Sequence, residues 1–244
     1  MKMEENENFK LELGRIRQTY AQFEQKGLGE TIWAPFNETE AAYRSQEFLA
    51  MAECFRKVSR LSLQGLKILD VGCGNGRILR SFVDMGADPA DLIGVDLLSD
   101  RIEQAKRLSP HLHFEGSSGI SLGFEDEQFD LVTQFVVFSS IKSAALRQRL
   151  ASEMVRVLRR GGFIYWWDMV RLAPSCGEGR LPVEPLFLSM DIAHELYIGK
   201  RPSLRECVRY VSVVKKLLSP LLDWLSYPVS HRAILLGPKP NHHQ

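Results

Sequence analysis

Residues 68–76 read Ile68-Leu69-Asp70-Val71-Gly72-Cys73-Gly74-Asn75-Gly76, an apolar stretch that runs directly into three glycines at alternate positions. The apolar residues predict a strand, and residues 77–83 carry apolar side chains at helical spacing. Glycine adopts backbone conformations that cost other residues energy, and it lets a ligand approach the backbone closely. The amides that open a helix also favour electron-rich groups. The segment therefore predicts a strand–turn–helix junction that binds a ligand.

The spacing of the glycines indicates which ligand to expect. A dinucleotide-binding turn has the pattern G-x-G-x-x-G, whereas this chain has D-x-G-x-G-x-G from Asp70, with Arg77 where the last dinucleotide glycine would stand. The pattern resembles the first motif of class I S-adenosylmethionine-dependent methyltransferases. The alternatives are a glycine-rich turn without a ligand and a nicotinamide site with a degenerate pattern.

Other blocks similar to this family follow in consistent order over residues 66–168. Phe129-Asp130-Leu131-Val132 resembles its F-D-x-V block, and Arg156-Val157-Leu158-Arg159-Arg160-Gly161-Gly162 resembles its R-V-L-x-x-G-G block. The resemblance implies an α/β fold with a Rossmann-like, doubly wound sheet of seven strands, mostly parallel, with an antiparallel last strand near residues 231–236. We expect a helical extension or lid over residues 1–60 and a methyltransferase domain over residues 61–244.

The hydrophobic pattern predicts alternating strands and helices, which favour a parallel sheet. Ser143 is expected to cap the helix before the glycine pair, and the pair Gly161-Gly162 to end it. The expected strands are 66–71, 92–96, 111–115, 129–135 and 162–168, followed less clearly by 208–214 and 233–236. The expected helices are 8–26, 38–60, 77–86, 99–108, 144–159 and 215–225.

Ligands of open α/β sheets bind beyond the carboxyl ends of the strands. Asp96 ends the second expected strand, where its carboxylate can accept hydrogen bonds from both hydroxyls of a ribose. Alternatively, Asp96 only caps the helix that begins near Ser99. The expected cofactor is S-adenosylmethionine, and the residues expected to bind it are Asp70, Gly72, Cys73, Gly74, Gly76, Asp96, Leu97, Ser117 and Gln134.

The chain departs from the family at Ser117. Methyltransferases of this type usually carry an acid there, which reaches the exocyclic amine of adenine. A serine can accept the same hydrogen bond without a charge, so contact with adenine would depend more on the backbone and on neighbours such as Ile120.

The resemblance implies methyl transfer to an acceptor held in line with the sulfur–carbon bond, mainly through positioning. A hydroxyl acceptor also needs a base. Asp168, after the fifth expected strand, and His194 are the candidates, although Asp168 could simply orient the next loop and His194 could be packed or exposed. The segment Gln134–Ser140, with Trp166-Trp167-Asp168, is similar to a bacterial subgroup linked with polysaccharide or secondary-metabolite pathways, which implies a small polar or glycan-like acceptor.

Two further segments suggest contacts with ligands. Trp33 and Phe36 could close over the cofactor or acceptor, or could pack against the domain. Arg205 and Arg209 could share a helix face and bind a phosphorylated acceptor, or belong to a solvated basic surface.

The composition narrows the class of protein. The net charge of +1 favours neither nucleic acid nor an anionic membrane as a partner. No stretch is apolar enough to predict a transmembrane helix, and the four cysteines include no C-x-x-C pair, so no metal site is predicted. We expect a cytoplasmic enzyme. The rival interpretations are a non-catalytic cofactor-binding scaffold, an NAD-dependent oxidoreductase and an RNA methyltransferase; the oligomeric state is not predicted.

Overall fold

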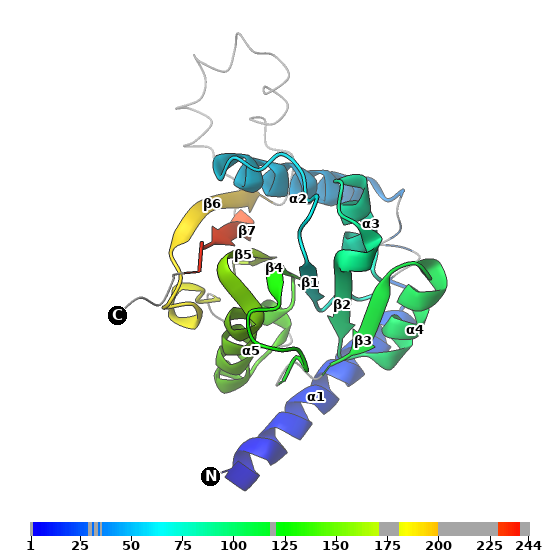
Figure 1. Cartoon of the computed structure of the whole chain (residues 1–244). Coiled ribbons are helices and arrows are strands. Elements are labelled where there is room, and N and C mark those ends of the chain that lie inside the picture. Colours follow the sequence, from blue (N-terminus) through cyan, green and yellow to red (C-terminus); the bar gives the residue numbers. More distant parts are fainter. Residues whose placement is uncertain are drawn as a thin grey trace.

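The computed structural model describes residues 2–28, 31, 34, 36–117, 121–170, 181–199 and 229–239. A seven-stranded sheet with the strand order β3-β2-β1-β4-β5-β7-β6 forms its centre (Figure 1). The strands are β1 (Ile68–Val71), β2 (Leu92–Asp96), β3 (His113–Gly116), β4 (Phe129–Phe135), β5 (Leu158–Met169), β6 (Ile192–Gly199) and β7 (Val229–Leu236).

The strand directions confirm the predicted sheet. The pairs β2–β3, β1–β2, β1–β4 and β4–β5 are parallel, whereas β7 is antiparallel to both β5 and β6. The antiparallel strand is the last in the sequence, at the place where the resemblance put it. This order leaves the carboxyl ends of β1, β2 and β4 at one edge of the sheet, where the ligand-binding turn begins.

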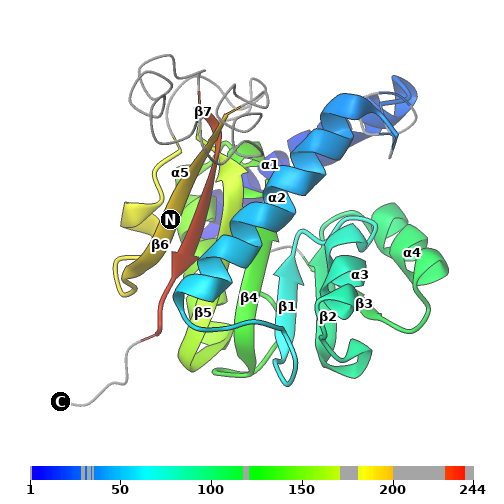
Figure 2. The ribbon, with the colours of Figure 1, turned by 90° about the horizontal axis from the view of Figure 1, so that it is seen from above.

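Helices cover both faces of the sheet (Figure 2). The helices are α1 (Lys2–Gln25), α2 (Glu38–Lys57), α3 (Arg77–Asp84), α4 (Ser99–Leu108) and α5 (Ala144–Val157), with short 3-10 turns η1 (Pro89–Asp91), η2 (Phe138–Ser140) and η4 (Glu184–Leu186). The side chains of α2, α3 and α4 enter one hydrophobic cluster, and those of α5 enter the other. The helices expected from the sequence before α5 are therefore present, with ends that differ by a few residues.

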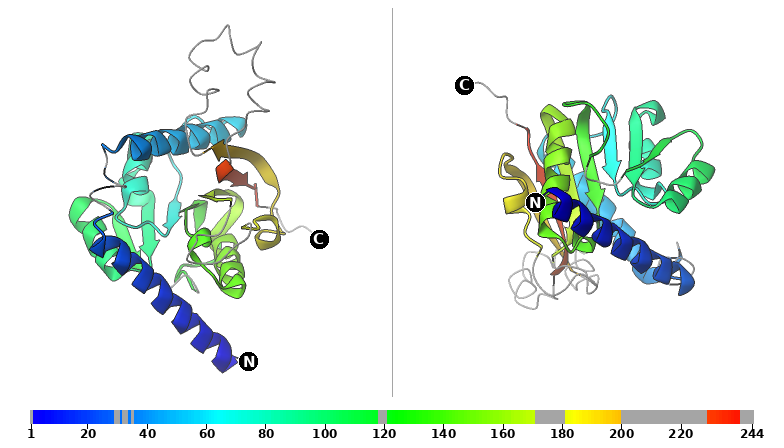
Figure 3. Two further views of the ribbon diagram at one scale, coloured as in Figure 1. Left: turned by 180° about the vertical axis from the view of Figure 1, so that it is seen from behind. Right: turned by 90° about the horizontal axis from the view of Figure 1, so that it is seen from below.

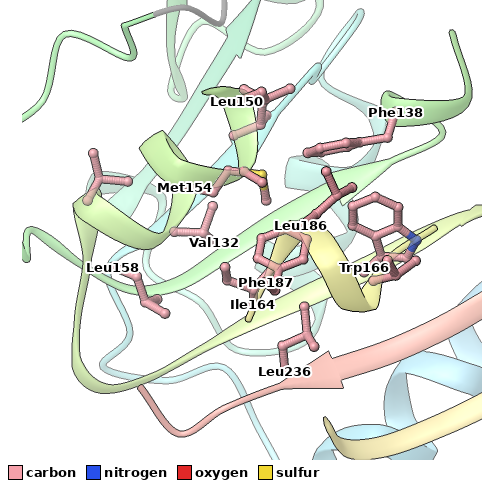
Figure 4. Close-up of a cluster of buried hydrophobic side chains, with 14 of the residues drawn as sticks. Val132, Phe138, Leu150, Met154, Leu158, Ile164, Trp166, Leu186, Phe187 and Leu236 are labelled. Carbon is pink, nitrogen blue, oxygen red and sulfur yellow. The ribbon is translucent and has the colours of Figure 1, made fainter. Parts of the chain in front are cut away.

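β5 shows how one strand serves both clusters. Side chains alternate between the two faces of a strand, so Ile164 and Trp166 enter the cluster beneath α5, and Tyr165 and Trp167 the cluster beneath α2. Figure 4 shows Trp166 beside the aromatic rings of Phe138 and Phe187. All four β5 side chains are fully buried, as the apolar run predicted for a central strand.

The start of α5 agrees with the prediction, but its end does not. Ser143 caps the helix by accepting a hydrogen bond from the Leu146 backbone N–H at 3.2 Å. The helix ends at Val157, and the glycine pair lies inside β5, where the pairing with β4 shifts in register. A Cβ on Gly162 would lie 2.8 Å from the Asp130 carbonyl oxygen. The prediction that Gly161-Gly162 ends the helix is thus wrong, because this pair makes a close strand contact.

The edge strand β6 was not expected from the sequence. It contains His194 and Glu195, and its pairing with β7 is irregular between Ile192 and His194. The polar pair His194-Glu195 interrupts the apolar residues of this strand, so it lacks the continuous apolar run that identifies buried strands. The strand expected at 208–214 and the helix expected at 215–225 lie outside the described residues.

α2 packs on the sheet as part of its core. Met51, Cys54 and Phe55 are buried among residues of β1, β5 and β7. The Trp167 indole N–H donates a hydrogen bond to the Tyr43 hydroxyl. The expected division of the chain at residue 60 stays a prediction, but α2 shares its hydrophobic cluster with the sheet that follows.

A buried ion pair joins α2 to the start of α3. One guanidinium nitrogen of Arg77 lies 3.0 Å from each carboxylate oxygen of Glu47. Glu47 is only 4% exposed, and burial raises the pKa of its carboxyl group although Arg77 opposes this rise. Without Arg77, the Glu47 carboxylate would be a buried charge with no compensating cation.

We expect Arg77→Met to lower the free energy of unfolding by about 2–3 kcal/mol, because it leaves that carboxylate unpaired in the core. Replacing both residues, as Arg77→Met with Glu47→Leu, should recover part of the loss. Chemical denaturation measures both. Arg160→Met, which affects the more exposed pair with Glu127, is the control and should cost less than about 1 kcal/mol. Equal losses in the two single variants would contradict the prediction.

Candidate cofactor site

The glycine turn is hydrogen-bonded to the end of β2. The backbone N–H groups of Gly72 and Cys73 donate to the Val95 carbonyl at 2.8 and 3.0 Å. The Gly74 N–H donates to Oδ2 of Asp96 at 2.9 Å. These bonds place the turn directly beside the carboxyl end of the neighbouring strand, as the sequence predicted for a ligand site.

Two positions in the turn require glycine. Gly72 has a φ of 74°, and a Cβ there would lie 2.3 Å from Cγ2 of Val137. Gly76 has a φ of 79°, and a Cβ there would lie 2.6 Å from the ring of Phe114. Positive φ angles and missing space both exclude larger residues. The pattern of glycines thus follows from the geometry of the turn.

Asp96 hydrogen-bonds to the backbone on both sides of it, and its assignment to a ribose stays a prediction. Its Oδ1 accepts a hydrogen bond from the Leu98 N–H at 2.9 Å, while Oδ2 holds the Gly74 N–H. The carboxylate thus orients the turns on both sides, and it also lines the pocket described next. Burial raises the pKa of Asp96, and the two backbone hydrogen bonds oppose this rise. Each carboxylate oxygen keeps further acceptor capacity for a ligand hydroxyl.

A pocket opens above this turn between the sheet edge and α1. Its lining is mostly apolar, and Asp96 is the only carboxylate and Arg101 the only cation among the described residues that line it. The lining comes from α1, α4, α5, the ends of β1, β2 and β4, the segment that follows β3, and the segment around η2. Its residues are Leu13, Ile16, Tyr20, Val71, Gly72, Val95, Asp96, Leu97, Leu98, Arg101, Ser117, Leu122, Phe135, Val136, Val137, Ser140, Ile141, Leu146 and Leu150.

Leu97 and Ser117 lie in the pocket, together with Gly72 and Asp96, as the sequence predicted. The Ser117 N–H donates to the Asp96 carbonyl at 2.8 Å, and its hydroxyl donates to the Ser121 carbonyl at 3.2 Å. The serine that replaces the usual acid is therefore positioned at the site. Ile120, its suggested neighbour, lies outside the described residues.

Asp70 lies beneath the turn instead of lining the pocket. It is 1% exposed, and its Oδ1 accepts a hydrogen bond from the Thr133 hydroxyl at 2.8 Å. Burial raises the pKa of Asp70 to about 7, although Thr133 and Arg77 oppose the rise. Asp70 therefore links the end of β1, just before the turn, to β4 through its hydrogen bond with Thr133.

Three other predicted residues also act from behind the pocket wall. The buried Gln134 side chain accepts a hydrogen bond from the Val137 N–H at 3.0 Å and donates to the Trp167 carbonyl at 3.3 Å. Cys73 is buried with its sulfur close to Gly94, and Gly76 precedes the first residue of α3. None of these side chains is among those that line the pocket.

Asp168, a predicted base, is fully buried at the end of β5. Its Oδ2 accepts hydrogen bonds from the N–H groups of Phe138 and Ser139 at 2.9 and 3.3 Å, and its Oδ1 accepts one from Met169 at 2.7 Å. Burial raises the pKa of Asp168 to about 6. The carboxylate does not line the pocket and instead anchors η2, in line with the alternative that Asp168 orients the next loop.

The structure does not bring His194, the other candidate base, to the pocket. His194 lies on the edge strand β6, opposite Leu235 of β7, and its Nε2 is 3.6 Å from a carboxylate oxygen of Glu53 on α2. Phe36 is 99% exposed, so its side chain neither packs against the domain nor covers the pocket. Trp33, Arg205 and Arg209 lie outside the described residues.

Most residues that line the pocket were not assigned to it from the sequence, and three of them, Tyr20, Val136 and Arg101, have notable geometry. Tyr20 of α1 lies 4.5 Å from the guanidinium carbon of Arg101, measured to the ring centroid. Val136 adopts a φ of 59°, a strained conformation for a β-branched residue. Its N–H donates to the Trp167 carbonyl at 2.8 Å. Arg101 follows Asp96 by five residues and could have been noticed, whereas no local pattern indicates the other two.

The raised pKa of Asp70 predicts a dependence of stability on pH. A carboxyl group whose folded pKa exceeds its ordinary value favours the fold in its neutral form, so this contribution is present below about pH 4 and lost as the pH rises to about 7. Relative to Asp70→Asn, the natural protein should therefore lose stability over this range, by about 1.4 kcal/mol for each pH unit that separates the folded pKa from the unfolded one.

Denaturation at several pH values measures this difference, and Asp168 titrates in both proteins, so its contribution cancels. Asp84→Asn, at an exposed position of α3, should keep the pH dependence of the natural protein. Parallel stability curves for the natural protein and Asp70→Asn would show that Asp70 is ionised in the fold without cost.

Within the described part of the chain, no helix is long and apolar enough to cross a membrane, and no group of His, Cys, Asp and Glu side chains could hold a metal ion.

Comparison with known proteins shows what part of this chain is similar to. Residues 69–166 match the family model described as "Methyltransferase domain". A phthiotriol/phenolphthiotriol dimycocerosates methyltransferase of Mycobacterium ulcerans is 32% identical over 116 residues, which are 47% of this chain and 41% of that protein. A ubiquinone/menaquinone biosynthesis C-methyltransferase of Campylobacter jejuni is 28% identical over 115 residues, 46% of this chain and 48% of that protein. The chain thus spans less than half the length of these relatives.

Solved structures share the fold. A putative sarcosine dimethylglycine methyltransferase from Galdieria sulphuraria has a TM-score of 0.58 at 16% identity, covering 82% of this chain and 87% of that chain. An S-adenosylmethionine-dependent methyltransferase from Mesorhizobium loti has a TM-score of 0.54 at 15% identity, covering 77% of this chain and 97% of that chain. Residues 69–166 are thus similar to a methyltransferase domain, and the chain has the fold of these S-adenosylmethionine-dependent methyltransferase structures.

Proposed function

We propose that this protein transfers a methyl group from S-adenosylmethionine to a small-molecule acceptor, at a hydroxyl oxygen of a sugar or a secondary metabolite. The observation that carries the proposal is the pocket lined by both Asp96 and Gly72. The Asp96 carboxylate can accept hydrogen bonds from ribose hydroxyls, and Gly72 has no side chain that would keep a ligand from the backbone. Two curated relatives are named as a phthiotriol/phenolphthiotriol dimycocerosates methyltransferase and a ubiquinone/menaquinone biosynthesis C-methyltransferase, and a third, at 25% identity, as a ribosomal protein L11 methyltransferase. The two names first given weigh more here because their identities are higher, 32% and 28%. These names support a small-molecule acceptor more than a macromolecular one.

The residues present fit this cofactor. Gly72 lines the pocket without a side chain, so a ligand can lie against the backbone of the turn. Asp96 would accept the ribose hydroxyls, and Leu97 and Ser117 would lie beside the adenine. Asp70, Gln134 and Asp168 would act indirectly, since their hydrogen bonds hold β4, Val137 and η2 in place.

The cofactor, when bound, supplies a methyl group that its sulfonium has already activated. The protein's remaining task is to orient the acceptor and to exclude water, and positioning of this kind can lower a barrier by about 7 kcal/mol or more. The apolar side chains of α1 and α5 that line the pocket would exclude water from it. Because Asp168 is fully buried, does not line the pocket and accepts three backbone N–H groups, we propose that this residue positions η2 and does not accept the acceptor's proton.

We further propose that the enzyme acts in the cytoplasm, binds no nucleic acid and has residues 61–244 as its catalytic domain, with residues 1–60 covering it. The net charge of +1 supports the absence of a nucleic-acid partner. The contacts of α1 with the pocket support the covering role of the N-terminal residues.

Titration calorimetry tests the cofactor site. We expect heat on adding S-adenosylhomocysteine and none on adding NAD. Asp96→Asn should weaken the affinity at least about tenfold, because it removes a charge that accepts two hydroxyl hydrogen bonds. Glu103→Gln, at an exposed position of α4, the helix that follows Asp96, should bind like the natural protein. Binding of NAD alone would favour the oxidoreductase interpretation, and unchanged affinity of Asp96→Asn would contradict the ribose assignment.

Asp96→Ala should also lower the free energy of unfolding, by about 1–3 kcal/mol, because the N–H groups of Gly74 and Leu98 lose their acceptor. Denaturation without ligand measures the loss of stability. A variant as stable as the natural protein would mean that water satisfies both N–H groups.

Incubation with methyl-labelled S-adenosylmethionine tests the reaction itself. We expect label on oxygen in a sugar or secondary-metabolite fraction, and none in protein or RNA. Label on carbon in a quinone fraction would contradict the proposed acceptor atom. A protein that binds the cofactor but labels no fraction from its own cells would favour the scaffold interpretation.

A further inference from the structure

α1 forms one wall of the pocket with a regular stripe of side chains. Leu13, Ile16 and Tyr20 follow one another at spacings of three and four residues, so they share one helix face, and all three line the pocket. Figure 3 shows α1 passing from the side of α5 to the side of α4, across the edge of the sheet. A ligand beside Asp96 and Gly72 would therefore lie beneath this helix.

The middle of α1 is held by a buried carboxylate. Glu12 is 8% exposed, and its Oε1 accepts a hydrogen bond from the backbone N–H of Lys142, just before α5. Arg15 holds both oxygens of Glu12 at 2.8 and 2.9 Å and also donates to the Ser140 carbonyl at 2.6 Å. The hydrogen bonds from Arg15 and Lys142 lower the pKa of Glu12 although burial opposes this. Ser140 itself lines the pocket, so the anchor is attached to the pocket wall.

The C-terminal part of α1 contacts the domain through the aromatic ring of Tyr20 and the cation of Arg101. The guanidinium of Arg101 lies 4.5 Å from the ring centroid of Tyr20, within the range of a cation–π interaction. A nitrogen of the same guanidinium lies 3.5 Å from the position that a Cβ on Gly74 would take. Nε of Arg101 is buried without a hydrogen-bond partner. Arg101 thus bridges the helix and the glycine turn.

We propose that α1 is a lid over the cofactor pocket, that Glu12 and the Tyr20–Arg101 pair are its two latches, and that exchange of the cofactor requires the latches to open. The inference rests on the proposed use of this pocket for S-adenosylmethionine. Tyr20 and Arg101 are positioning residues in this account, because they close the pocket over the ribose side. The apolar stripe between the latches excludes water from the space where the methyl group is transferred.

The release rate of bound S-adenosylhomocysteine tests the lid. The protein is loaded with labelled ligand and chased with an excess of unlabelled ligand. We expect Tyr20→Leu and Glu12→Gln each to raise the release rate about tenfold, and Tyr20→Phe, which keeps the aromatic face, to behave like the natural protein. Gln18→Ala, on the exposed side of α1 and outside the pocket lining, is the control. Release rates that are equal in Tyr20→Leu, Glu12→Gln and the natural protein would overturn the proposal.

Amide hydrogen exchange of the natural protein gives a second readout that depends on no variant. We expect the amides of α1 around residues 12–20 to exchange more slowly when S-adenosylhomocysteine is bound, because the ligand would hold the lid closed. Exchange in α1 that is unaffected by bound ligand would overturn the lid while leaving the cofactor site intact. A natural protein that binds no S-adenosylhomocysteine would overturn the proposed function and the lid together.

Discussion

The hydrogen bonds between the glycine turn and the end of β2 are the constraint on which the site depends. The turn has positive φ angles at Gly72, Gly74 and Gly76. The N–H groups of Gly72, Cys73 and Gly74 therefore find their hydrogen-bond acceptors outside the turn. The Val95 carbonyl and the Asp96 carboxylate accept its N–H groups and so join the first two strands at their carboxyl ends. Because the same carboxylate lines the pocket, the group that shapes the turn is also the group that we propose as the acceptor for the ribose hydroxyls.

The parts of the fold that follow local rules could be predicted from the sequence. The buried strands β1, β2, β4 and β5 have apolar patterns, and the glycines of the turn occur where a side chain would collide with Val137 or Phe114. Asp96, Leu97 and Ser117 follow strand ends and therefore reach one edge of the sheet. The edge strand β6 could not be predicted in the same way, because its place depends on pairing with β7 and not on an apolar pattern of its own.

Residue type and position at a strand end were less informative about catalysis. Asp168 stands where an acceptor's base would be expected, but three backbone N–H groups use its carboxylate. The Gln134 amide is likewise bonded to the backbone of Val137 and Trp167. A polar side chain at the end of a central strand has two ways to satisfy its hydrogen bonds, through a ligand or through the next loop. The sequence does not distinguish them, since the distinction depends on which backbone groups the loop leaves unpaired.

The first 60 residues contain two helices with different physical roles. α2 buries Met51, Cys54 and Phe55 in the same cluster as the sheet, and its Glu47 compensates the charge of Arg77 next to the glycine turn. Removing α2 would thus expose the core and leave an unpaired guanidinium beside the site. α1 instead lies at the border of the other cluster, against which, among its described side chains, only Phe9 and Ile16 pack as partly buried ones, and its remaining contacts with the domain include the polar ones of Arg15, Glu12 and Tyr20. Polar contacts of this kind exchange readily with water, whereas buried apolar area does not, so α1 is the element of the two that can open without unfolding the sheet.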